Sequence, residues 1–132
     1  MKSILPVVDY ELAISLKMMG FSEPVYYQYK NSKLMEDEDS KGFCNYNGLD
    51  SDDTVSAPFL QEVQTWLSRK KRVDVLVYRD MFFNQADKYY GVVIRRKDNM
   101  IRETGRVISS NLALEAGVKT AVKLLCKKRK RK

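Results

Sequence analysis

The stretch Val73-Asp74-Val75-Leu76-Val77-Tyr78 decides the fold of this chain. Three valines alternate with residues of mixed character, and this period of two predicts a β-strand. Residues 89–96, with the sequence YYGVVIRR, predict the next strand. Asp98-Asn99 then predicts a two-residue turn into a third strand that ends near Glu103. Together these segments predict an antiparallel meander.

Two helices are predicted upstream of the meander. The first runs from about Tyr10 to Met19, with Asp9 as its N-cap, because apolar residues recur there at helical spacing. The second is predicted to begin at Ser56 as N-cap, with Pro58 in its first turn. Its apolar face comprises Phe59, Leu60, Val63, Trp66 and Leu67.

A third helix is predicted downstream, beginning near Ser110 or Asn111. Gly117 inside this helix costs about 1 kcal/mol relative to alanine. A close approach between the helix and the sheet would explain that cost. We therefore expect the third helix to pack directly on the meander.

The segment between the first two helices combines a short hairpin with an acidic region. Residues 25–30 and 33–35 predict two strands joined at Asn31-Ser32. Residues 36–55 contain seven acids and predict a long acidic loop. The resulting order is α-β-β-α-β-β-β-α, which predicts a single α+β domain over residues 1–126, with helices packed on an antiparallel sheet.

A basic tail at residues 127–132 carries most of the net charge. The chain has 24 Lys+Arg and 17 Asp+Glu, hence +7, and six of the basic residues are consecutive at its end. They are Lys127, Lys128, Arg129, Lys130, Arg131 and Lys132. The remaining body has a net charge of only +1, so the sequence predicts a near-neutral domain with a cationic end.

Several classes of chemistry are disfavoured by the composition. The chain has no histidine, the usual general base and commonest metal ligand. Its two cysteines, Cys44 and Cys126, match no zinc or redox spacing. The acidic segments fail the calcium-loop pattern. We expect no metal site, no cofactor and no enzymatic activity.

No apolar run approaches the roughly 20 residues that span a bilayer. We therefore expect no contact with a membrane and a location in the cytoplasm of the host cell.

Two kinds of surface are candidates for binding. Basic residues that suit phosphate contacts occur at Arg69, Lys70, Lys71, Arg72, Arg95, Arg96 and Lys97, and again in the tail. An aromatic loop between two predicted strands contains Met81, Phe82 and Phe83, which suit contacts with a protein. A solvated face or helix end is the alternative explanation for each basic group.

Two resemblances accompany these patterns. Residues 57–126 share the order α-β-β-β-α with double-stranded-RNA-binding domains, and residues 111–121, NLALEAGVKTA, are similar to that family's last helix. The lysines that the family places at the start of this helix are replaced by Ser109-Ser110-Asn111. Residues 16–24, 57–67 and 113–118 resemble small uncharacterised proteins from phages and mobile elements of Bacteroidetes. The second resemblance implies a context and no activity.

Two functions are compatible with the sequence. The first is a non-catalytic accessory protein of a phage or mobile element that binds an unknown protein partner. The second is a nucleic-acid-binding module that uses the tail and the other basic groups. The sequence leaves the partner and the oligomeric state open.

Overall fold

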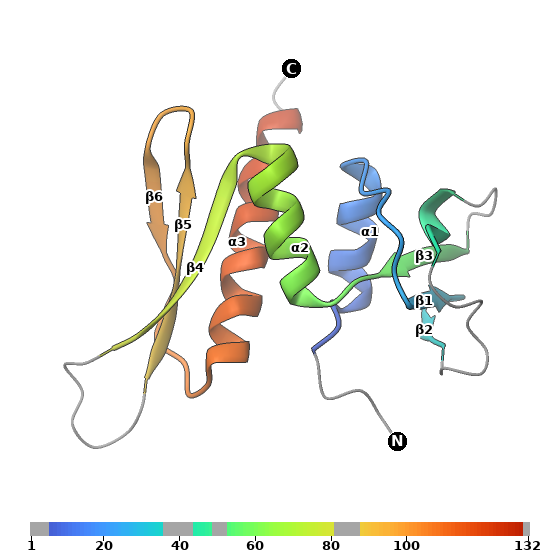
Figure 1. The fold of residues 1–132 in the computed structure, drawn as a ribbon, viewed down its shortest axis with the longest axis horizontal. Helices are drawn as coiled ribbons and strands as arrows, with labels where there is room; N and C mark the ends of the chain where they lie inside the picture. Colours follow the sequence, from blue (N-terminus) through green and yellow to red (C-terminus); the bar gives the residue numbers. More distant parts are fainter. Residues whose placement is uncertain (1–5, 36–43, 49–52, 81–87, 131–132) are drawn as a thin grey trace. The chain divides into compact units, whose positions relative to one another are not determined.

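The computed structural model describes residues 6–35, 44–48, 53–80 and 88–130, with side chains described up to residue 126. The chain divides into two compact units, Met1–Phe59 and Leu60–Lys132. The predicted α+β class, with helices on antiparallel strands, is confirmed (Figure 1). The described strands form two three-stranded sheets, one in each unit, where the sequence had suggested one sheet.

In the first unit, helix α1 (Tyr10–Met18) accompanies strands β1 (Tyr27–Lys30), β2 (Lys33–Leu34) and β3 (Thr54–Ala57). The sheet order is β2-β1-β3, and both pairings are antiparallel. The predicted N-cap is confirmed, because Asp9 Oδ1 accepts a hydrogen bond from the backbone N–H of Leu12 at 2.9 Å. Gly20 follows the helix with φ of +93°, a conformation that glycine adopts without strain.

Strand β3 corrects two predictions. Ser56 is a fully buried strand residue and not the N-cap of the second helix, which begins at Leu60. Its backbone N–H donates to Asn47 Oδ1 at 2.8 Å, and its Oγ accepts from the backbone N–H of Asn47 at 3.1 Å. The acidic region therefore ends in a buried strand. Of the predicted loop 36–55, residues 36–43 and 49–52 lie outside the described part, and residues 46–48 form a 3₁₀ turn.

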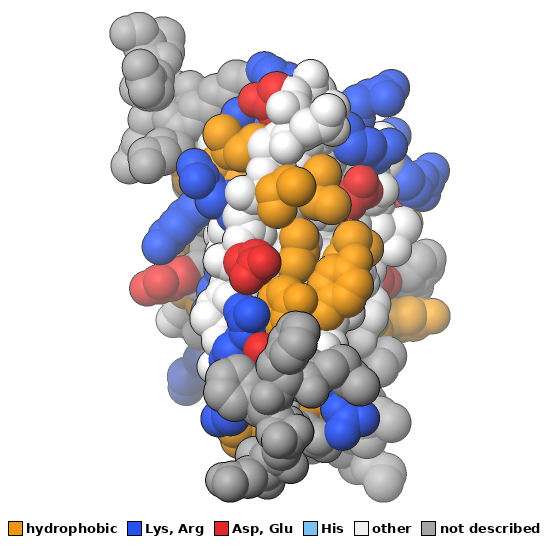
Figure 2. Space-filling view, turned by 90° about the vertical axis from the view of Figure 1, so that its left-hand side faces the viewer, with side chains coloured by type: hydrophobic (Ala, Val, Ile, Leu, Met, Phe, Trp, Pro, Cys, Tyr) orange, Lys and Arg blue, Asp and Glu red, His pale blue; other side chains and the backbone are white. Residues whose placement is uncertain are grey.

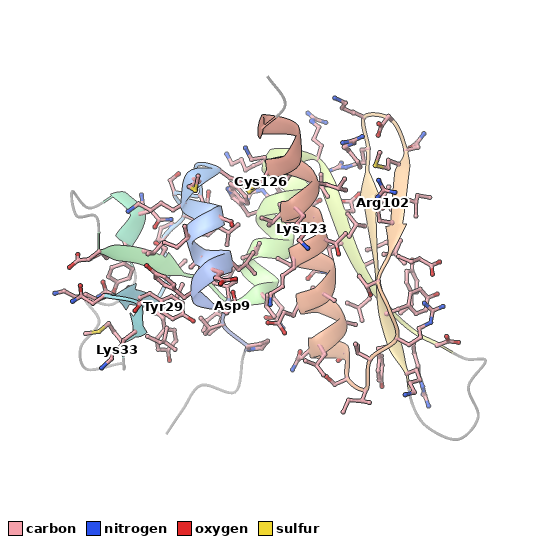
Figure 3. All side chains as sticks on the ribbon, turned by 180° about the vertical axis from the view of Figure 1, so that it is seen from behind. Asp9, Tyr29, Lys33, Arg102, Lys123 and Cys126 are labelled. Carbon is pink, nitrogen blue, oxygen red and sulfur yellow. The ribbon has the colours of Figure 1, made fainter. Side chains whose placement is uncertain are left out.

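A tyrosine links helix and sheet in the first unit (Figure 3). The hydroxyl of Tyr29 on β1 donates to the carbonyl of Val8 at 2.8 Å, just before the Asp9 cap. Burial raises the pKa of Tyr29, and the charge of Asp9 adds to the shift. Tyr10 packs edge-on against the Tyr29 ring with centroids 5.4 Å apart. These contacts fix the start of α1 on the sheet.

The second unit has the predicted order α-β-β-β-α. Helix α2 (Leu60–Trp66) continues as a π-helical turn, η3 (Leu67–Lys71). Strands β4 (Val73–Arg79), β5 (Tyr89–Arg95) and β6 (Met100–Glu103) follow, and α3 (Ser110–Lys130) ends the described chain. The strands pair antiparallel in the order β4-β5-β6, so the predicted meander is confirmed.

Helix α3 lies closely against one face of this sheet. The helix begins at Ser110, as predicted, and its N-cap is Ser109, because Ser109 Oγ accepts a hydrogen bond from the backbone N–H of Leu112 at 3.1 Å. A Cβ on Gly117 would lie 2.6 Å from Val75 Cγ1, and one on Gly91 would lie 2.9 Å from the carbonyl oxygen of Ala113. The close approach expected at Gly117 is confirmed, and it leaves the other face of the sheet turned away from α3.

Candidate functional site

The face of the β4–β5–β6 sheet that points away from α3 is mostly apolar. Side chains alternate between the two faces of a strand, and the buried Val75 and Val93 mark the face under α3. Their neighbours therefore point outward, and the register sets them side by side across the strands. The apolar residues on this outer side are Leu76, Tyr78, Tyr90, Val92, Ile94 and Ile101, and we call them the open face.

Part of the open face is exposed to solvent. Leu76, Tyr78 and Ile101 expose 37%, 46% and 60% of their surface, and the other three residues are partly exposed. Figure 2 shows apolar side chains gathered over the middle of this side, with charged side chains around them. A contiguous apolar patch with a charged border is typical of an interaction surface.

Two carboxylates share the outer side of the sheet with these residues, and each is neutralised by an arginine. Asp74 Oδ2 lies 3.3 Å from Arg96 Nε. Glu103 Oε1 lies 3.3 Å from Arg106 Nη1. The surface around the open face is therefore not acidic, although two acids point the same way.

Arg106 also fixes the aromatic end of the open face. Its Nε donates to Oδ2 of the buried Asp80 at 2.7 Å, and this bond raises the pKa of Arg106. Its guanidinium lies 3.9 Å from the centroid of the Tyr90 ring. Tyr90 in turn neighbours Tyr78, with centroids 5.8 Å apart. The arrangement holds the Tyr90 ring in place without covering the patch.

The first basic group, Arg69 to Arg72, closes the second helix. Arg72 adopts the left-handed conformation with φ of +58°, and its N–H donates to the carbonyl of Leu67. Lys71 lies 5.4 Å from the Trp66 ring centroid. Arg69, Lys70 and Arg72 are exposed. Three of the four cations are therefore accessible.

The second basic group, Arg95 to Lys97, is mostly engaged in ion pairs. Arg95 bonds both carboxylate oxygens of Asp98, at 3.1 and 2.8 Å, and this pairing lowers the pKa of Asp98 to about 2. Arg96 pairs with Asp74. Lys97 is exposed in the turn between β5 and β6. Lys97 therefore remains the most accessible cation of this group.

The structure brings these two basic groups together. The backbone N–H of Arg96 donates to the carbonyl of Arg72 at 3.1 Å, and the Arg96 guanidinium donates to the carbonyl of Ser68. The C-terminal end of α3 lies at the same end of the second unit (Figure 1). The α3 backbone is helical through Lys127, Lys128, Arg129 and Lys130, while Arg131 and Lys132 lie outside the described residues. We call the region formed by Arg69 to Arg72, Arg95 to Lys97 and the C-terminal end of α3 the basic end.

The net charge of +7 is the sum of two opposite charges. Residues 1–59 contain 5 Lys+Arg and 10 Asp+Glu, a net charge of −5. Residues 60–132 contain 19 Lys+Arg and 7 Asp+Glu, a net charge of +12. The cationic character therefore belongs to the whole second unit and extends well beyond the tail.

The proposed aromatic contact residues Met81, Phe82 and Phe83 lie outside the described residues. The open face was not among the sites predicted from the sequence. Its signal was present, because Leu76, Val92 and Ile94 are apolar at positions that alternate with the buried valines. Strands with two apolar faces are expected to be covered on both sides.

In the part of the chain that the structure describes, no three Cys, Asp or Glu residues gather closely enough to hold a metal ion. Among those same residues, no helix has the length and apolar character needed to cross a membrane. The chain matches no protein-family model, no curated protein and no solved structure.

Proposed function

We propose that this chain is a non-catalytic accessory protein that binds another protein through the open face. The observation that carries the proposal is a three-stranded sheet covered by α3 on one side and presenting six apolar side chains on the other. Burying such a face is favourable in proportion to the apolar area removed from water. The phage or mobile-element context and the host cytoplasm remain part of this proposal, on the resemblance given above.

A non-catalytic role agrees with the chemistry of the described side chains. The whole chain lacks histidine. The buried carboxylate of Asp80 accepts a hydrogen bond from Arg106, and Arg95 lowers the pKa of Asp98 to about 2. These carboxylates stabilise the fold around the sheet and are not poised for proton transfer.

Site-specific photocrosslinking in cells that produce the chain tests the proposal. A photoreactive phenylalanine analogue at Ile101, on the open face, should give an adduct with a different protein. The same analogue at Ile108, which is 71% exposed but lies between β6 and α3, should not. Leu76→Ser in the Ile101-labelled chain should remove the adduct. Equal adducts at both positions, or adducts only between copies of this chain, would refute the proposal.

A second function is favoured by the basic end. Two groups that are distant in sequence meet there, and the end of α3 adds consecutive cations. We propose that this region binds the phosphates of a nucleic acid without sequence preference, since phosphate contacts position a protein and do not specify bases.

Salt dependence separates the contributions to that binding. Six tail cations and the four exposed cations at Arg69, Lys70, Arg72 and Lys97 predict a slope of about −8 to −9 in log K against log salt for duplex DNA. Deleting residues 127–132 should reduce this slope to about −3 to −4. Fluorescence anisotropy with a labelled duplex measures both values. An absence of binding by the full chain at about 50 mM salt would end this second proposal.

A further inference from the structure

We propose that the segment covering the open face is an amphipathic helix of the partner protein, with apolar residues on one side and acidic residues along its flanks. This inference rests on the proposed protein-binding function and specifies the chemistry of the partner. It follows from the shape of the face and from the charge around it.

The shape of the face suits a helix. Strands lie about 4.8 Å apart, so the three strands present a surface about 10 Å across, close to the diameter of a helix. The open-face part of β5, from Tyr90 to Ile94, spans about five residues, or about 17 Å, which about twelve helical residues cover. Helix α3 already packs on the opposite face of the same strands, over Val75 and Gly91. A helix on the second face completes a three-layer arrangement.

The charge of the second unit selects an acidic helix. The unit carries a net charge of +12, and the acids that point outward beside the open face, Asp74 and Glu103, are each paired with an arginine. Arg102 on β6 is level with Val93 and therefore points to the α3 side, whereas Lys97 in the adjoining turn is exposed and the guanidinium groups of Arg96 and Arg106 lie at the border of the open face. Acidic residues that flank the apolar side of a partner helix would lie close to these cations, whereas basic residues at the same positions would be repelled by them.

The same charge disfavours a second copy as the occupant. Two copies packed open face to open face would bring together two units that each carry +12, six of these charges in the tail, and like-charged units repel each other. A nucleic acid would bind the basic end in preference to the open face, because the aliphatic centre of the open face has no hydrogen-bond donor for a phosphate. An acidic partner helix satisfies both the apolar centre and the cationic border.

Designed peptides test the inference on the full chain. The probe is a synthetic helix of about 14 residues with leucines on one face and glutamates on the other. One control replaces the glutamates by lysines, and another scrambles the order so that no apolar face forms. Methyl NMR shifts of Leu76, Val92, Ile94 and Ile101 report binding to the open face, and those of Ile108 serve as a reference outside it.

The expected result is saturable shifts at the four open-face residues with the glutamate peptide, and at least about tenfold weaker binding of the lysine peptide at low salt. Ile101→Ser should weaken the binding of the glutamate peptide about fivefold, and Ile108→Ser should leave its affinity unchanged. The peptide comparison uses the unaltered chain, so it stands even where a variant fails to fold.

Three outcomes would overturn the inference: equal affinity for the two charged peptides, equal affinity for the scrambled peptide, or shifts confined to the basic end. Absence of any binding at about 1 mM peptide would overturn it as well. The proposed function is judged separately by the adduct at position 101. If the crosslinked adduct forms at position 101 but the glutamate peptide binds no better than the lysine peptide, the chain binds a protein through the open face and the acidic partner helix is rejected.

Discussion

Replacing Gly117 by alanine should destabilise this protein, although the same change stabilises most helices. In an unconstrained helix the substitution contributes about 1 kcal/mol of stability. Here the added Cβ would lie 2.6 Å from Val75 Cγ1, whereas carbon atoms in contact lie about 3.5–4.0 Å apart. Val75 is only 1% exposed and stiff about χ1, so its methyl group has little room to move. Overpacking of this kind costs about 1–3 kcal/mol.

The net expectation is a loss of up to about 2 kcal/mol in the free energy of unfolding for Gly117→Ala. In a Val75→Ala background the clash disappears, and the same substitution should stabilise by about 1 kcal/mol. The difference, about 1–3 kcal/mol, is the coupling energy of a double-mutant cycle. Urea denaturation of the four proteins measures it. Stabilisation by Gly117→Ala in the native background, or equal effects in both backgrounds, would contradict the close packing of α3 on β4.

Three further predictions concern polar contacts. Asn47→Ala should lower the free energy of unfolding by about 2–4 kcal/mol, because the Asn47 amide forms hydrogen bonds with the Phe21 carbonyl and the Ser56 N–H. Urea denaturation measures this loss, and a value below about 0.5 kcal/mol would contradict the prediction. Arg106→Met should lower the midpoint of urea denaturation by removing the ion pair with the buried carboxylate of Asp80, and Arg106→Lys should recover part of that loss. Asp98 has a pKa of about 2 when paired with Arg95, below the unfolded value of about 3.9. The pair therefore stabilises the fold above about pH 4, and its contribution disappears as the pH falls towards 2. Carboxyl NMR titration should show this low value, and a normal pKa for Asp98 would refute the pairing.

The strands and helices of the second unit were predictable because each signal there is local. The alternation in 73–78 and the Asp98-Asn99 turn both report constraints from near neighbours. Strand β3 was not predictable from such signals. Thr54 and Ser56 are small and polar and follow an acidic run, which favours a loop or a helix cap. They are buried because β1, which is distant in the sequence, pairs with them and because Asn47 forms hydrogen bonds with Ser56.

The candidate site divides in the same way. The sequence determined which residues of β4 and β5 share a face, because side chains alternate along a strand. It did not determine which face α3 covers, because valines line one side while Leu76, Val92 and Ile94 line the other. Only tertiary packing decided that choice, through the fit of Gly117 over the valine side. Tertiary structure also decided which cations are engaged: Arg95 and Arg96 meet carboxylates of the β5–β6 turn and of β4, whereas Lys97 between the same elements stays exposed.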